Sequence, residues 1–183
     1  HTVSANALTG GGRKVRPGEI SLATGGILFL DELPEFSKNA LEVLRQPMEE
    51  GRVVISRTDG TYEFPAEFQL VAAMNPCKCG YYPDRSKCHC LPGEVAKYVK
   101  RISRPLLDRI DICVEIPRVV YRDLTSEEEN ESSAKMRKRV EQARQIQEKR
   151  YEKAGWKFNS RLGTAAIREF CPLGTDEQKL MEL

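Results

Sequence analysis

The stretch that decides the fold class spans residues 25–32 and reads Gly25-Gly26-Ile27-Leu28-Phe29-Leu30-Asp31-Glu32. Four consecutive apolar residues between a glycine pair and two acids predict a strand buried on both faces of a parallel sheet. The carboxyl ends of such strands are where open α/β sheets bind ligands. Adjacent acids at this edge suit nucleotide hydrolysis, in which the first holds a hydrated Mg²⁺ and the second orients an attacking water. The alternative is a strand followed by two solvated acids.

Two more buried strands are predicted downstream, at residues 68–74 and 110–116. The first ends in Asn75, which is either an amide brought toward a γ-phosphate or a turn-forming residue before proline. Arg109 stands just ahead of the second strand. It either pairs with a neighbouring aspartate or projects toward another subunit as an arginine finger.

Helix and turn signals surround these strands. Asp59-Gly60 predicts the turn of a β-hairpin spanning Arg52–Phe64. Ser37 is a predicted N-cap for a helix that runs to about Gln46. Residues 93–108 predict a helix that Pro105 interrupts or restarts.

The composition shifts sharply after Pro117. Residues 126–153 predict a highly charged helix, residues 159–170 predict another, and a third begins before Leu183. We therefore expect an α/β part in residues 1–120 and a helical part in residues 121–183.

Four of the six cysteines lie within residues 77–90, at Cys77, Cys79, Cys88 and Cys90. No secretory signal pattern opens the chain, so this clustering indicates a reducing compartment, the cytoplasm, and a metal site rather than a disulfide framework. Four thiolates saturate one tetrahedral Zn²⁺. The Cys-x-Cys pairs are tighter than the usual Cys-x₂-Cys, and His89 is an alternative ligand. The competing interpretation is a reduced loop whose thiols only pack.

Composition sets outer limits on function. The 183 residues are 40% hydrophobic and 31% charged, an ordinary balance for a globular protein. No uncharged apolar window is long enough to span a membrane. The net charge is only +2, so any nucleic-acid binding must come from local basic loops.

Together these motifs resemble the AAA+ ATPases of the magnesium-chelatase-like subgroup, and within it the ComM (YifB) proteins. The resemblance extends from residue 1 to about residue 172. The segments that carry it are Gly10-Gly11-Gly12, RPGEISLA at 16–23, LFLDELPEF at 28–36, LEVLRQP at 41–47, VISR at 54–57 and AMNPC at 73–77.

The resemblance implies a fold and a set of site residues. The fold is a partial P-loop AAA+ three-layer αβα domain, with parallel-sheet strands 3–5 present, followed by the start of an α-helical lid. Asp31 and Glu32 match the Walker B acids, with Asp31 on Mg²⁺, while Asn75 matches sensor 1 and Arg109 the arginine finger. The hairpin matches the pre-sensor-1 hairpin of a hexameric ring. Arg57 near its tip is then a contact to the DNA backbone, or simply an exposed hairpin residue.

The function implied by the resemblance is that of an ATP-hydrolysing motor subunit acting on DNA, helicase-like and linked to branch migration in natural transformation. Its cofactors are ATP and Mg²⁺, with Zn²⁺ at the cysteines, and its partners are single-stranded or branched DNA and further copies of itself, without a membrane. One alternative is a chelatase-like or chaperone-like ATPase that remodels a protein partner. Another is a non-catalytic, zinc-stabilised binding module.

One expected motif is absent from the sequence. No Gly-x-x-x-x-Gly-Lys-Ser/Thr phosphate loop occurs between His1 and Leu183. In the family this loop and strands 1 and 2 lie upstream of the Walker B strand, in a sheet of order 5-1-4-3-2, and the sensor-2 arginine follows later. We therefore expect residues 1–183 alone to lack ATPase activity and to fold poorly.

Overall fold

The computed structural model describes residues 3–117, 131–156 and 158–182. The chain forms two compact units, His1–Ile116 and Pro117–Leu183. Within the described ranges, no helix has both the length and the apolar character that a membrane crossing requires.

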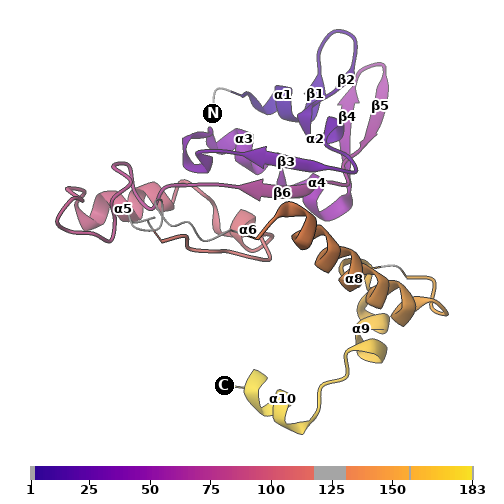
Figure 1. Cartoon of the computed structure of the whole chain (residues 1–183). Coiled ribbons are helices and arrows are strands. Elements are labelled where there is room, and N and C mark those ends of the chain that lie inside the picture. Colours follow the sequence, from indigo (N-terminus) through magenta and orange to yellow (C-terminus); the bar gives the residue numbers. More distant parts are fainter. Residues whose placement is uncertain (1–2, 118–130, 157, 183) are drawn as a thin grey trace. The chain divides into compact units, whose positions relative to one another are not determined.

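A pair of parallel strands forms the centre of the first unit. Strand β3 (Ile27–Leu30) pairs with β6 (Gln69–Ala72), from Ile27 opposite Gln69 to Leu30 opposite Ala72. The two strands lie side by side in Figure 1. This pair confirms an α/β fold. It also confirms the predicted strand before Asp31 and the strand predicted at residues 68–74, which is shorter in the structure.

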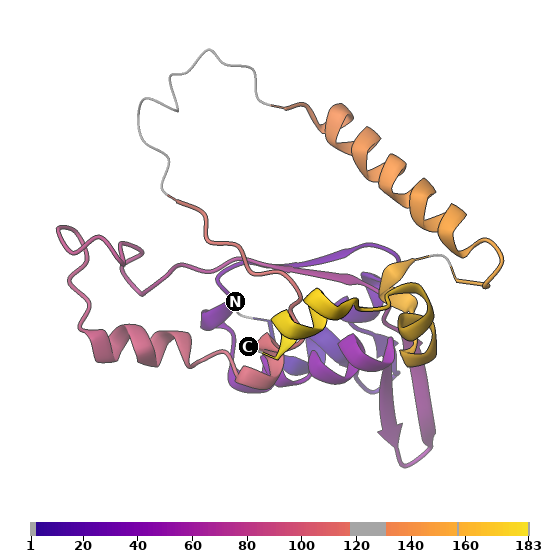
Figure 2. The same ribbon diagram turned by 90° about the horizontal axis from the view of Figure 1, so that it is seen from below.

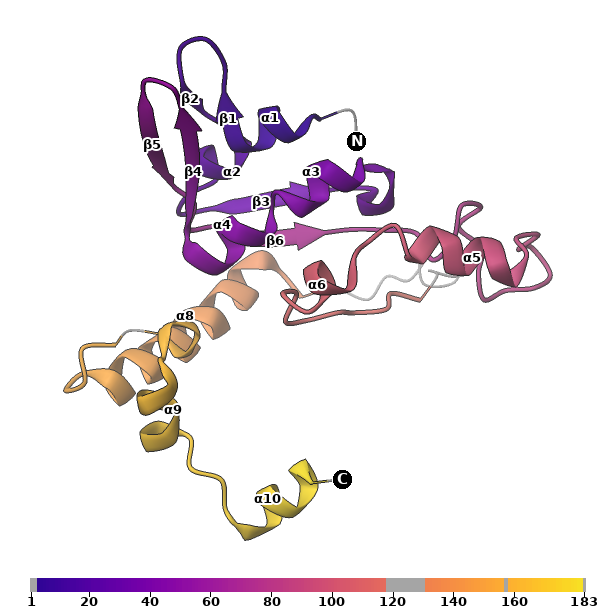
Figure 3. The ribbon, with the colours of Figure 1, turned by 180° about the vertical axis from the view of Figure 1, so that it is seen from behind.

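The core of this unit lies on one face of β3. Leu28 and Leu30 point into it, and the helices that accompany them are α1 (Ala5–Thr9), α2 (Glu19–Leu22), α3 (Lys38–Glu42), α4 (Arg45–Glu50) and α6 (Arg104–Leu107). Figure 3 shows α3 and α4 running along β3. The buried core residues are Leu8, Ile20, Leu28, Leu30, Leu33, Phe36, Ala40, Leu41, Leu44, Val53, Ala66, Ile102 and Leu106.

The other face of β3 is exposed, so the prediction that both faces are buried is wrong for the described structure. Ile27 and Phe29 are 62% and 58% exposed. Successive side chains of a strand point to opposite faces, and here the helices pack on the face of Leu28 and Leu30.

The strand predicted at residues 110–116 is also absent from the described structure. Its apolar residues Ile112, Val114 and Ile116 are 78%, 74% and 82% exposed. A strand exists only where a neighbour completes its hydrogen-bond ladder, and no described strand pairs with this segment. The predicted run of three parallel strands is therefore reduced to two.

Two β-hairpins project from the first unit. The predicted hairpin is confirmed as β4 (Arg52–Arg57) and β5 (Gly60–Pro65), and its loop is Thr58-Asp59, because Arg57 pairs with Gly60. Figure 2 shows it extending away from the helices.

The second hairpin falls in a stretch where no strand was predicted. It joins β1 (Gly10–Gly11) to β2 (Arg16–Pro17). Gly10 has φ 93°, and a Cβ there would lie 2.2 Å from the carbonyl oxygen of Arg16, so only glycine allows these strands to approach.

The helix signals of the first unit are confirmed, but the helix predicted from Ser37 to about Gln46 is divided into α3 and the start of α4. Ser37 caps α3 by accepting the N–H of Ala40 at 3.2 Å. The helix predicted at 93–108 is divided into α5 (Pro92–Val99) and α6, and Pro105 lies in the first turn of α6. Proline is tolerated there because the first N–H groups of a helix have no intrahelical acceptor.

The second unit is helical among the residues described. It contains α8 (Ser133–Tyr151), η2 (Asn159–Arg161), α9 (Thr164–Phe170) and α10 (Thr175–Met181), while residues 126–130 of the predicted charged helix lie outside the described ranges. Tyr151 is fully buried. Its ring meets Phe170 edge-on at 5.0 Å, and its hydroxyl donates to Oδ1 of Asn159 at 2.7 Å.

Candidate functional site

Asp31 and Glu32 directly follow β3 and are both exposed. They open a tight turn that continues into η1 (Leu33–Glu35), and we name residues 31–35 the acid turn. The N–H of Glu32 donates to Oδ1 of Asp31 at 2.8 Å. Glu32 itself adopts a left-handed conformation, with φ 52° and ψ 47°.

Backbone hydrogen bonds beyond β6 fasten the acid turn to the segment that leads to Asn75. The N–H of Ala73 donates to the carbonyl of Leu30, and the N–H of Leu33 donates to the carbonyl of Ala73, both at 3.0 Å. The structure therefore brings the acids and the Asn75 segment to the same edge of the sheet, as parallel strands predict. A Cβ on Gly80 would lie 3.8 Å from Oδ1 of Asn75, so the cysteine loop packs beside this amide.

Arg109 lies elsewhere in the first unit, against helix α4. Its guanidinium forms an ion pair with Glu49 and donates to the carbonyl of Pro105, and its side chain is 23% exposed. Its acidic partner is thus Glu49 rather than a neighbouring aspartate. The arginine-finger role concerns a second subunit and stays a prediction.

The four cysteines converge as the sequence predicts. All four Sγ atoms lie within 4.8 Å of one another. The Sγ separations are 3.3 Å for Cys77–Cys79, 3.6 Å for Cys79–Cys88 and 3.8 Å for Cys77–Cys88. A tetrahedral Zn²⁺ with Zn–S bonds of about 2.3 Å requires sulfur separations of about 3.8 Å. The loop is therefore folded to the dimensions of a metal site, and the donor set that the described residues form consists of these thiols without His89.

The protonation of these thiols also fits metal binding. Burial alone would raise the pKa of Cys77, but hydrogen bonds from the Tyr82 N–H, the Cys79 thiol and the Tyr81 N–H outweigh it, and the pKa falls to about 6. Burial raises the pKa of Cys88. At Cys90 a backbone hydrogen bond from Cys79 lowers the pKa, but the Cys79 thiol, burial and the Cys77 thiol together outweigh it and raise the pKa to about 11. A divalent cation would remove the mutual repulsion between thiolates.

Exposed basic residues lie on the two hairpins of the first unit. A Cβ on Gly11 would lie 3.1 Å from Nη2 of Arg57, so the guanidinium rests against the backbone of β1. The β1–β2 hairpin carries Arg13, Lys14 and Arg16, and all four basic side chains are exposed. None of them takes part in an ion pair among the described residues. We name these four residues the cationic hairpin pair; the contact of Arg57 with β1 could not be predicted, because the β1–β2 hairpin was not.

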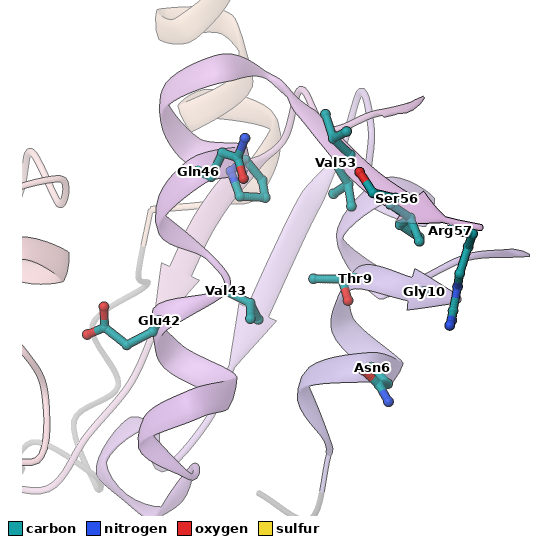
Figure 4. A pocket seen from close by; sticks show the side chains of 12 residues that line it. Asn6, Thr9, Gly10, Glu42, Val43, Gln46, Val53, Ser56 and Arg57 are labelled. Atoms are coloured by element: carbon teal, nitrogen blue, oxygen red, sulfur yellow. The ribbon is translucent and has the colours of Figure 1, made fainter. Parts of the chain in front are cut away.

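A hollow of about 380 Å³ lies beside Arg57, between α1, the α3–α4 segment and β4. Figure 4 shows Arg57 and Gly10 together on one side of it and Val43 facing it from the helix. Neither the acid turn nor any of the four cysteines lines it. It is therefore separate from the residues that carry the predicted chemistry.

Two protein-family matches cover most of the chain. Residues 1–124 match the family described as magnesium chelatase, subunit ChlI, and residues 130–183 match the C-terminal part of that subunit. The chain belongs to the magnesium chelatase ChlI family. Members of this AAA+-type family are in general ATPases that use ATP and Mg²⁺.

Within the magnesium chelatase family, the relatives found place the chain among the ComM/YifB proteins, as the motifs indicated. It is 43% identical over 183 residues to competence protein ComM of Haemophilus influenzae. It is also 43% identical over 186 residues to YifB of Escherichia coli. Both matches cover all of this chain but only 35% of the relative, so the chain spans about a third of the length of these proteins.

Proposed function

We propose that this chain is part of an ATP-driven motor subunit that acts on DNA, and that it supplies the residues that hydrolyse ATP. The observation that carries the proposal is the fastening of the acid turn to the Asn75 segment at the carboxyl end of β3 and β6. Two acids and an amide at one edge of a parallel sheet are among the groups that a P-loop ATPase uses to hydrolyse nucleotide.

In this proposal each side chain has a separate role. Asp31 would hold Mg²⁺, which favours carboxylate oxygens and retains several waters. Glu32 would orient the attacking water and accept its proton, and Asn75 would donate a hydrogen bond to the γ-phosphate. We also propose that the full-length protein has a phosphate loop and the strand order 5-1-4-3-2 of the P-loop fold.

Arg109 would complete the site from a neighbouring subunit of a hexameric ring. A guanidinium stabilises the charge that develops on the transferred phosphoryl group. In the described structure Glu49 and the Pro105 carbonyl hold this guanidinium within its own chain. Closure of a ring interface would then present it to the next acid turn.

The cationic hairpin pair would contact the DNA. Exposed arginine and lysine side chains bind the phosphate backbone irrespective of sequence, which is what a translocating motor needs. One relative, from Haemophilus influenzae, is named competence protein ComM. A DNA-handling role in the cytoplasm is part of this proposal.

The four cysteines would hold a structural Zn²⁺. Four sulfur ligands fill a tetrahedral shell, so such an ion has no open position for catalysis. Its role would be to stiffen the loop that packs beside Asn75 through Gly80.

The test is ATP turnover by the full-length protein, with and without single-stranded or branched DNA. We expect turnover that DNA stimulates and that Glu32→Gln abolishes. Stimulation by a protein partner instead of DNA would favour a remodelling ATPase. No turnover under any condition would reject the ATPase proposal in favour of a zinc-stabilised binding module.

A further inference from the structure

Arg101, two residues beyond the end of α5, bridges to the acid turn across 66 residues of sequence. Its Nη1 donates to Oε2 of Glu35 at 2.9 Å and to the carbonyl oxygen of Pro34 at 3.1 Å. We propose that Arg101 is a positioning residue, which holds the acid turn in the geometry that ATP hydrolysis needs. This inference rests on the proposed function, because it concerns the same two acids.

The acid turn requires such support. Glu32 adopts a left-handed conformation that a residue with a Cβ occupies only under constraint. On one side the constraint is the backbone bond from Leu33 to Ala73. Within the turn, the N–H of Glu35 donates to the carbonyl of Glu32 at 2.8 Å. Arg101 binds the far end of the same turn, and bonds from a charged donor are stronger than those between neutral groups.

Buried residues on either side of Arg101 fix its backbone, so its guanidinium can position the acid turn. Its neighbours Tyr98 and Ile102 are 4% and 3% exposed, and Ile102 belongs to the core. Burial and then the Glu35 carboxylate raise the pKa of Tyr98. The backbone that carries the guanidinium is therefore anchored, although the side chain is 47% exposed.

Helix α5 also starts at the cysteine cluster. Leu91, its N-cap, directly follows Cys90, and Arg101 lies just past its other end. The helix thus connects the metal-ligand loop on one side of the site with the acid turn on the other. Arg101 contacts the acid turn at Pro34 and Glu35.

The guanidinium is specific for this contact. It is planar and presents several N–H donors, so it serves a backbone carbonyl and a carboxylate together. A lysine ammonium reaches this position on a flexible stem without a fixed donor geometry. We therefore expect Arg101→Lys to support only part of the activity.

The experiment measures steady-state ATP hydrolysis by the full-length protein with single-stranded DNA. Arg101→Ala is expected to lower kcat by about tenfold or more with KM for ATP little changed, since the loss concerns the transition state. Guanidinium at millimolar concentration should restore part of kcat to this variant. Glu35→Gln should lower kcat too, and Arg101→Ala combined with it should be no worse than Arg101→Ala alone, because both remove one interaction. Lys100→Ala, at the adjacent exposed residue, is the matched control and should match the wild type.

Each outcome decides the inference. Unchanged kcat in Arg101→Ala, with an active wild type, overturns it and leaves the proposed function standing. A fall in kcat that accompanies a lower melting temperature and resists rescue by guanidinium assigns a purely structural role and also overturns it. A wild type that hydrolyses no ATP rejects the proposed function, and this inference with it.

Discussion

The backbone N–H of Glu32 lies 2.8 Å from Oδ1 of Asp31 and donates a hydrogen bond to it. The backbone of one acid thereby orients the carboxylate of the other. The two acids are consequently unequal. Asp31 is presented in a fixed orientation, which suits a cation ligand, whereas Glu32 carries its carboxylate on a longer side chain that suits the positioning of water.

We expect Glu32→Gln in the full-length protein to bind ATP normally but to hydrolyse it about 100- to 10,000-fold more slowly. The amide keeps the size of the side chain but cannot accept a proton from water. Nucleotide binding by calorimetry and phosphate release measure the two effects separately. Glu115→Gln, at an exposed acid of the same unit, is the control. Near-normal turnover in Glu32→Gln would assign the catalytic role to another residue.

We expect the full-length protein, purified without chelators, to contain about one Zn²⁺ per chain, as four thiolates fill one tetrahedral shell. Elemental analysis measures the content. Cys88→Ser should reduce both the zinc content and the melting temperature, because Cys88 is buried within the cluster. Cys171→Ser, at an exposed cysteine of the second unit, should change neither. A stable protein with almost no metal would contradict the site.

Arg109→Ala should reduce hydrolysis by about 1,000-fold or more while nucleotide affinity is retained, because a finger acts on the transition state. Mixing this variant with Glu32→Gln subunits should restore some activity, since some interfaces then combine an intact Arg109 with an intact Glu32. Arg104→Ala, at an exposed arginine of α6, is the control. If mixed rings form and remain inactive, Arg109 does not act across an interface.

Arg57→Ala should weaken binding of single-stranded DNA about equally for all sequences. It should lower the slope of log K against log salt by about 0.7, the value for one lost phosphate contact. Replacing Arg13, Lys14 and Arg16 as well should lower the slope further, since these residues lie on the adjacent hairpin. Lys38→Ala, on α3, is the control. Basal ATP turnover should not change, and a loss restricted to particular sequences would indicate base contacts instead.

A polypeptide limited to residues 1–183 should bind a hydrophobic dye strongly and melt without a sharp transition. The reason is the exposed apolar surface formed by Ile27 and Phe29 on β3 and by Ile112, Val114 and Ile116 in the segment that follows α6. The double variant Ile112→Ser and Val114→Ser should reduce the dye signal. Dye binding as low as that of a typical folded domain, with a cooperative melt, would contradict this expectation.

Local patterns in the sequence predicted the elements that depend on neighbouring residues. The apolar run before Asp31, the Ser37 cap and the turn between β4 and β5 all appear where expected. The convergence of the cysteines was likewise predicted, because two Cys-x-Cys pairs on a short loop have few ways to lie apart.

The features that sequence reasoning missed depend on contacts between distant segments. Nothing near Arg101 or Arg109 in the sequence identifies Glu35 or Glu49 as its partner, since helix packing alone brings each pair together. The strand wrongly predicted at residues 110–116 fails for a related reason. Its alternating apolar residues can be read from the segment alone, but a strand also needs a neighbouring strand to complete its hydrogen bonds.

The left-handed backbone at Glu32 has a consequence for how this position would respond to selection. A library randomised at residue 32 and screened only for a folded protein should drift toward glycine or asparagine, which adopt this conformation more readily than glutamate. The same library screened for ATP hydrolysis should be enriched in glutamate at this position. The difference in glutamate frequency between the two selected populations would then measure how far the catalytic need for a carboxylate outweighs the conformational strain at residue 32.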